Sequence, residues 1–247
     1  MNTKVLLASG TILAVLAGGA AVQASAAEVS ATTSHNLVTF IAGDDSTGPV
    51  DPTDPTHPVD PEEPVDPEDP ENPGTGNKGP LSLDYVTNFK FGTHKISGQN
   101  QSYAAKNVKS YIQLSDTRGT SAGWTLKATP GEFKSAAGDV LKGATVSLGK
   151  GNMITAGDAK APEAVATALT AGESSTVIKA AKGTGEGTWV DQLFDKSVTR
   201  DDAPKEDLGA NEVVKLNVVG GTAKATSYTS DVKWSLEDTP MDDAPEA

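Results

Sequence analysis

Acidic side chains are the residues with which this chain could most readily do chemistry. A glycosidase places two carboxyl groups across a sugar, and four aspartates fall close together late in the chain. These are Asp191, Asp195, Asp201 and Asp202. Spacing alone does not pair any two of them, and a solvated acidic loop is the simpler interpretation. The sequence therefore gives no convincing catalytic pair.

Nucleophilic and metal chemistry find little support either. His94 is the only histidine after residue 80, and the Gly-x-Ser-x-Gly turn that exposes a nucleophilic serine is absent. The chain has no cysteine, which excludes thiol catalysis and cysteine-based zinc sites. The run from Gly183 to Gly187 resembles a phosphate-binding loop but lacks the Lys-Ser/Thr pair that should follow it. We therefore expect no enzyme activity, no cofactor and no metal.

Three tryptophans remain as candidate ligand contacts, because an aromatic ring can stack on the face of a sugar. Trp124 and Trp234 each stand two residues before a leucine, and a core position is the favoured interpretation for both, since a leucine gains most from burial. Trp189 follows a glycine-rich turn. We therefore expect Trp189 to be more exposed and to be the direct contact.

Two short stretches position the paired tryptophans. Trp124-Thr-Leu126 and Trp234-Ser-Leu236 each lead to a Thr-Pro pair, and residues two apart lie on the same face of a strand. Both stretches therefore predict half-buried strands. Each strand should end near its proline, Pro130 or Pro240, because proline donates no ladder hydrogen bond.

The chain resembles the WxL-domain proteins of Gram-positive cell surfaces. The resemblance rests on the two Trp-x-Leu strands, on residues 79–92 (GPLSLDYVTNFKFG) and on Gly187-Thr-Trp189. It implies a secreted protein that is held non-covalently at the cell wall through peptidoglycan or another wall polymer. It also leaves open a protein-interaction subunit that is retained through other wall-associated surface proteins. The residues that it marks for wall binding or for the motif are Trp124, Leu126, Trp189, Trp234 and Leu236.

The N-terminal part of the chain predicts export. Residues 1–27 have a lysine, then an apolar run, then small residues, as in a signal peptide. The apolar run is shorter than a membrane-spanning helix needs, so we expect no membrane span in the mature chain. Residues 28–48 contain one candidate strand, 35–42. Pairing of this strand with the domain's own sheet is favoured, and addition to a partner's sheet is the alternative.

Residues 49–79 read as a linker that ends in a glycine-rich hinge. Proline occupies every third position from Pro49 to Pro73, which matches the three-residue turn of polyproline II. From Asp44 to Pro73 there are eleven acidic residues and no Lys or Arg, and their repulsion should stiffen the segment. An extended rod on the order of 75 Å long is expected.

Residues 80–247 are expected to form the WxL cell-wall-binding domain. Many short alternating runs with close turn signals predict an all-β fold, a single β-sandwich or barrel-like domain with long loops. One exception is 160–171, whose composition favours a short helix or a single surface turn. Between Pro80 and Leu236 there are 18 basic and 16 acidic residues, so no basic surface for nucleic acid is expected.

Overall fold

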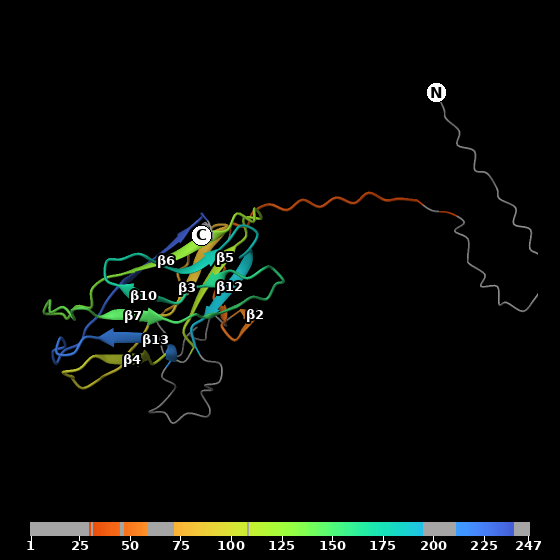
Figure 1. The fold of residues 1–247 in the computed structure, drawn as a ribbon. Coiled ribbons are helices and arrows are strands. Elements are labelled where there is room, and N and C mark those ends of the chain that lie inside the picture. The colour runs from red at the N-terminus through yellow and green to blue at the C-terminus, as the bar shows by residue number, and fades with distance from the viewer. Residues whose placement is uncertain are drawn as a thin grey trace, which may run out of the picture. The chain divides into compact units, whose positions relative to one another are not determined.

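The computed structural model describes residues 30, 32–44, 47–58, 72–107, 109–194 and 211–239. The predicted signal peptide, most of the proline-rich repeat and the acidic stretch after residue 194 lie outside these residues. The chain divides into two units, Met1–Thr39 and Phe40–Ala247. All strands belong to the second unit (Figure 1).

The described residues form strands and no helix, so no helix that could cross a membrane is found among them. The strands are β1 (Val50–Asp51), β2 (Asp54–Pro58), β3 (Leu81–Val86), β4 (Gln101–Ala105), β5 (Tyr111–Asp116), β6 (Trp124–Pro130), β7 (Thr145–Leu148), β8 (Asn152–Ile154), β9 (Glu163–Ala164), β10 (Thr167–Thr170), β11 (Ser175–Ala180), β12 (Gly187–Gln192), β13 (Asn211–Val218) and β14 (Val232–Glu237).

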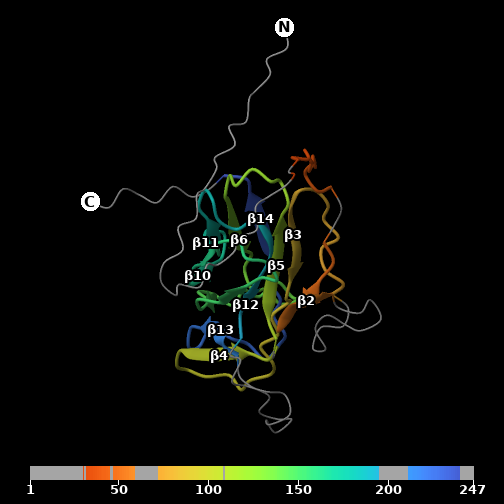
Figure 2. The ribbon, with the colours of Figure 1, turned by 90° about the vertical axis from the view of Figure 1, so that its right-hand side faces the viewer.

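Three antiparallel four-stranded sheets surround the core. We call β14-β6-β11-β9 the motif sheet, β10-β7-β13-β4 the groove sheet and β3-β5-β12-β8 the support sheet. In Figure 2 the motif sheet lies beside the support sheet, and β13 and β4 run crosswise at one end. All three sheets contribute side chains to one apolar cluster. The predicted all-β, sandwich-like class is confirmed.

The two Trp-x-Leu strands are direct neighbours in the motif sheet. β6 and β14 lie side by side (Figure 2) and pair antiparallel. Trp234 stands opposite Ala128, and Leu236 stands opposite Leu126. Opposite residues in an antiparallel pair point to the same face, so both motifs send their apolar side chains toward the core. Trp124 and Leu126 are fully buried there. β14 stands at the end of the sheet, and its inward side chains are only partly buried.

The support sheet departs from the simple alternation that the sequence predicts. Leu83 and Tyr85 are two residues apart and would share a face in a regular strand, but the register shifts between them, and Asp84 forms a bulge. A bulge inserts one residue and turns the following side chains to the other face. Leu83 therefore joins the main core, whereas Tyr85 stacks on Tyr111 in a second cluster, with ring centroids 4.3 Å apart.

The second cluster is covered by residues 47–58, which we call the strap. Val50 is buried against the two tyrosines, and its amide donates to the Gln113 side chain at 2.8 Å. The Gln192 side chain donates to the Pro52 carbonyl. The strap therefore packs as part of the domain, and in this respect it differs from the linker that the sequence predicts from residue 49.

The far end of the proline-rich segment also packs on the support sheet. Asn72 donates to the Val86 carbonyl, and the Thr75 amide donates to the Asp84 carbonyl at 2.9 Å. A Cβ atom placed on Gly74 would lie 3.1 Å from the Pro49 side chain. The two ends of the segment are therefore in contact, which contradicts a straight rod that holds them far apart. Side-chain anchoring by the support sheet overrides the local proline preference.

Two further local predictions are wrong. Residues 35–42 have no regular secondary structure, and their apolar side chains are exposed. Residues 160–171 contain β9 and β10 and no helix. β10 pairs with β7 over four residues, and the ladder overrides a helix-favouring composition.

Candidate functional site

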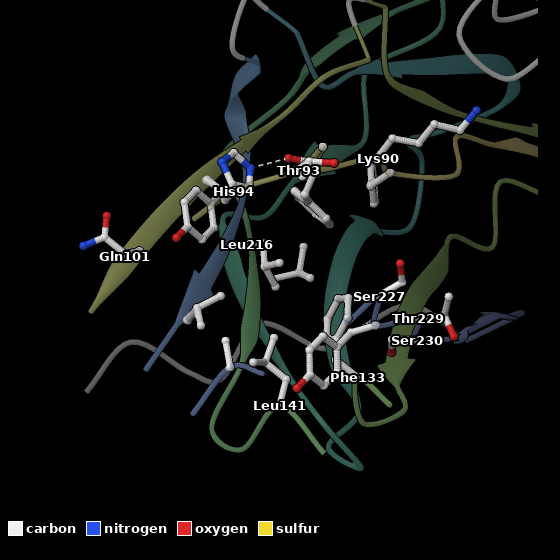
Figure 3. A pocket seen from close by; sticks show the side chains of 18 of the residues that line it. Lys90, Thr93, His94, Gln101, Phe133, Leu141, Leu216, Ser227, Thr229 and Ser230 are labelled. Carbon is white, nitrogen blue, oxygen red and sulfur yellow. Dashed lines mark hydrogen bonds between the residues drawn. The ribbon is translucent and has the colours of Figure 1, made fainter. Parts of the chain in front are cut away.

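A groove of about 690 Å³ lies between the groove sheet and β14. Its floor is apolar and includes Val146 from β7 and Leu216 from β13. The loop of residues 87–100 borders one side, and residues 223–231 border the other. Figure 3 shows Leu216 between His94 and Thr93 on one side and Phe133 and Ser227 on the other.

Aromatic side chains line this groove from segments that are far apart in the sequence. All are half-buried, so each ring packs on the protein through part of its surface and presents the remainder. They are Phe89, Phe91, Tyr103, Phe133, Tyr228 and Trp234. His94 adds a seventh ring, because it stacks on Tyr103 with centroids 3.8 Å apart, and its Nε2–H donates to the Phe91 carbonyl at 2.6 Å.

The rim of the groove is polar and carries more positive than negative charge. Lys90, Lys95 and Lys224 lie on it, and Asp231 is the only carboxylate among its described lining residues. Lys224 forms an ion pair with Asp139, which lies outside the lining, and this pair raises the pKa of the Lys224 ammonium group. An apolar aromatic floor with a hydroxyl- and ammonium-bearing rim is the composition of a ligand-binding cleft.

Trp124 and Trp189 do not reach this groove. Trp124 is fully buried, and Trp189 is only 2% exposed, so the prediction of an exposed Trp189 is wrong. β12, which carries Trp189, is paired on both sides, with β5 and with β8. The glycines that precede Trp189 indicated an exposed turn, but the strand after them enters the core.

The glycine run resembling a phosphate loop serves these two indoles. The Trp124 indole N–H donates to the Gly185 carbonyl at 3.1 Å, and the Trp189 indole N–H donates to the Glu186 carbonyl at 2.9 Å. A buried indole needs such a partner for its N–H group. Gly185 has φ +78°, and a Cβ atom there would lie 2.8 Å from the Trp124 indole nitrogen. The run is therefore a structural support for the first Trp-x-Leu motif.

Trp234 is the one tryptophan that lines the groove. It lies on β14 together with Leu236, and both are half-buried against the core. Trp234 is therefore the only residue marked by the resemblance that lines the groove. The other rings were not predicted, and the usable signal was the close spacing of Phe89, Phe91 and His94.

Asp191 is the one of the four candidate aspartates that the structure describes. Asp191 lies on β12, is 1% exposed, and its Oδ1 atom has no hydrogen-bond partner among the described residues. Burial raises the pKa of Asp191 to about 7. The solvated loop predicted for Asp191 is wrong, and Asp195, Asp201 and Asp202 lie outside the described residues. No group of three potential metal ligands occurs among the described residues.

Comparison with models of protein families identifies the family to which this chain is related. The family model described as WxL domain, surface cell wall-binding, matches residues 27–240. Searches of curated proteins and of solved structures gave no match. The match includes both paired Trp-x-Leu strands, the groove and the strap, and it implies a place at the cell surface or wall. The chain therefore belongs to the family of WxL-domain proteins, whose domain binds the cell wall at the surface.

Proposed function

We propose that the groove binds the glycan strands of peptidoglycan and holds the secreted protein at the wall without cleaving its ligand. The observation that carries this proposal is the set of half-buried rings along the groove. A pyranose presents an apolar face to a ring and hydroxyl groups to a polar rim. The groove offers both surfaces side by side.

The charge of the rim agrees with this ligand. Peptidoglycan carries carboxylates beside its sugars, and an ammonium group is a strong donor to a carboxylate. Lys90 and Lys95 lie on the loop that borders the floor. A teichoic acid offers phosphates to the same lysines but fewer sugar faces to the rings. The aromatic floor therefore favours the glycan.

The lining also favours binding over hydrolysis. A glycosidase uses two carboxyl groups placed across the scissile bond. The described lining has a single carboxylate, Asp231. A non-catalytic role is therefore the simpler function for this groove.

Sedimentation of the mature chain with purified, protein-free cell walls tests the ligand. Co-sedimentation that persists after removal of teichoic acids is the expected result. Loss of binding after that removal would assign the anionic polymer as the ligand. Absence of binding to both preparations would contradict the proposal and make a protein partner the means of retention.

Tyr228 allows the groove itself to be tested. Its ring lines the groove, and its hydroxyl oxygen accepts a hydrogen bond from the Lys224 amide at 3.0 Å. Tyr228→Ala should weaken wall binding about tenfold, because about 1.4 kcal/mol of stacking is lost. Tyr228→Phe keeps the ring and should bind nearly as the native chain. Lys182→Ala removes an exposed side chain outside the groove and should have no effect. Equal losses in the two Tyr228 variants would argue against stacking.

A further inference from the structure

The least expected surface of the chain is an exposed apolar segment near its N-terminus. Leu37, Phe40 and Ile41 are 93%, 87% and 92% exposed, and Val38 is 71% exposed. These residues follow an extended path without regular structure (Figure 1). Contiguous exposed apolar side chains of this size are uncommon on a protein that acts alone and mark interaction sites.

The composition of this segment is that of a strand. Leu37 to Ile41 contains two β-branched aliphatic residues, a threonine and a phenylalanine, with no charge and no proline. Apolar side chains alternate onto both faces, as in strands that are covered on both sides. A segment of this kind gains most when it joins a sheet edge that already has apolar neighbours.

β14 provides such an edge. Among the described strands β6 is its only neighbour, so its outer backbone edge is not used by the sheet. Its inward side chains Trp234 and Leu236 face the core but stay half-buried, whereas their neighbours on β6 are fully buried. The difference arises because nothing in the described chain adds a strand beyond β14.

We propose that residues 37–41 of one copy add as an antiparallel strand to β14 of a second copy of this chain. This inference does not rest on the ligand proposed for the groove. It concerns the backbone edge of β14, and its readout is self-association.

Charge selects the direction of the added strand. Asp44 follows the segment, and β14 has Lys233 at its start, with Glu237 and Asp238 at its end. An antiparallel strand directs Asp44 toward the Lys233 end. A parallel strand would direct it toward two carboxylates, and like charges across neighbouring strands are destabilising.

Pair preferences select the register. Phe40 opposite Trp234 and Val38 opposite Leu236 place two apolar pairs on the core-facing side. The same register sets Thr39 opposite Ser235, and aromatic, aliphatic and hydroxyl pairs of this kind favour a sheet. The half-buried side chains of β14 are then covered by Phe40 and Val38, which are 87% and 71% exposed in the free segment.

Analytical ultracentrifugation of the mature chain tests the association. Dimers or larger assemblies are expected at high concentration. Phe40→Asp should raise the dissociation constant at least about tenfold, because it puts a charge opposite an apolar ring. A native chain that stays monomeric over the accessible concentrations would overturn the proposal.

Disulfide trapping tests the partner surface, because the chain has no cysteine of its own. Opposite residues in an antiparallel pair are close enough for a disulfide. A mixture of Thr39→Cys and Ser235→Cys chains should form cross-linked heterodimers under mild oxidation. Ala168→Cys, exposed on the edge strand β10 of another sheet, is the matched control and should cross-link far less. Equal trapping at Ala168→Cys, or none at Ser235→Cys, would refute docking on β14.

Discussion

Replacing Asp191 with asparagine should flatten the dependence of stability on pH. Burial raises the pKa of this carboxyl group from 3.8 to about 7 in the folded chain. The unfolded chain therefore releases the proton near pH 4, and the folded chain keeps it until about pH 7. Because the folded state binds more protons in this window, its stability falls as the pH rises through it. The free energy of unfolding falls by on the order of 4 kcal/mol across this window, because each pH unit contributes about 1.4 kcal/mol.

Thermal unfolding between pH 4 and pH 8 measures this effect. A loss of that size corresponds to a fall in Tm of roughly 10 °C for a domain of this length. The asparagine of Asp191→Asn is uncharged at every pH in this range, so the Tm of this variant should fall much less than that of the native chain. Asp158→Asn removes an exposed carboxylate and should keep the native slope. Burial also raises the pKa of Asp84, and this effect has the same sign, so a small slope should remain in Asp191→Asn. Parallel curves for the native chain and Asp191→Asn would refute the reasoning.

Four other substitutions test the supports of the tryptophan strands. Gly185→Ala should cost about 2–4 kcal/mol, because a Cβ atom there meets an indole nitrogen at 2.8 Å. Gly183→Ala has a similar φ of +81° but open space around it, and should cost only about 1 kcal/mol in chemical denaturation. Arg118 makes a bidentate ion pair with Asp116, with contacts of 2.9 and 2.7 Å. Arg118→Lys should therefore lower the free energy of unfolding by about 1–2 kcal/mol, which chemical denaturation measures. Trp189→Ala should lower the free energy of unfolding by about 3–5 kcal/mol, because it removes a buried ring. A variant that keeps native stability but loses wall binding would contradict the core position of Trp189.

The strands that hold the motif were predictable because their pattern is local. Alternation of apolar residues predicted the shared face of Trp124 and Leu126 and that of Trp234 and Leu236. The family resemblance came from the same residues. Side-chain periodicity of two is sufficient to give the face of a strand.

The arrangement of those strands was not predictable by the same means. β6 and β14 are far apart in the sequence, and nothing in either stretch specifies the other as its neighbour. The bulge at Asp84 changes which face Tyr85 occupies, and it depends on how β3 pairs with β5. The strap was missed because proline favours an extended chain locally, whereas Gln113 and Gln192 anchor it from distant strands.

The groove was missed for a related reason. Its rings come from β4, β14 and several loops, and each ring alone has the sequence context of an ordinary core residue. Trp189 was chosen as the contact from its neighbouring glycines. In the structure the Glu186 carbonyl within that glycine run accepts a hydrogen bond from the Trp189 indole N–H, and pairing on both sides of β12 buries the ring.

Mapping of amide chemical shifts during titration with soluble peptidoglycan glycan fragments tests the central claim most directly. The account predicts changes that concentrate on residues 89–103, on Phe133 and on residues 227–234, around the groove. Changes centred on the strap and the stacked pair Tyr85 and Tyr111 would contradict it, and so would a spectrum that does not respond to the fragments at all.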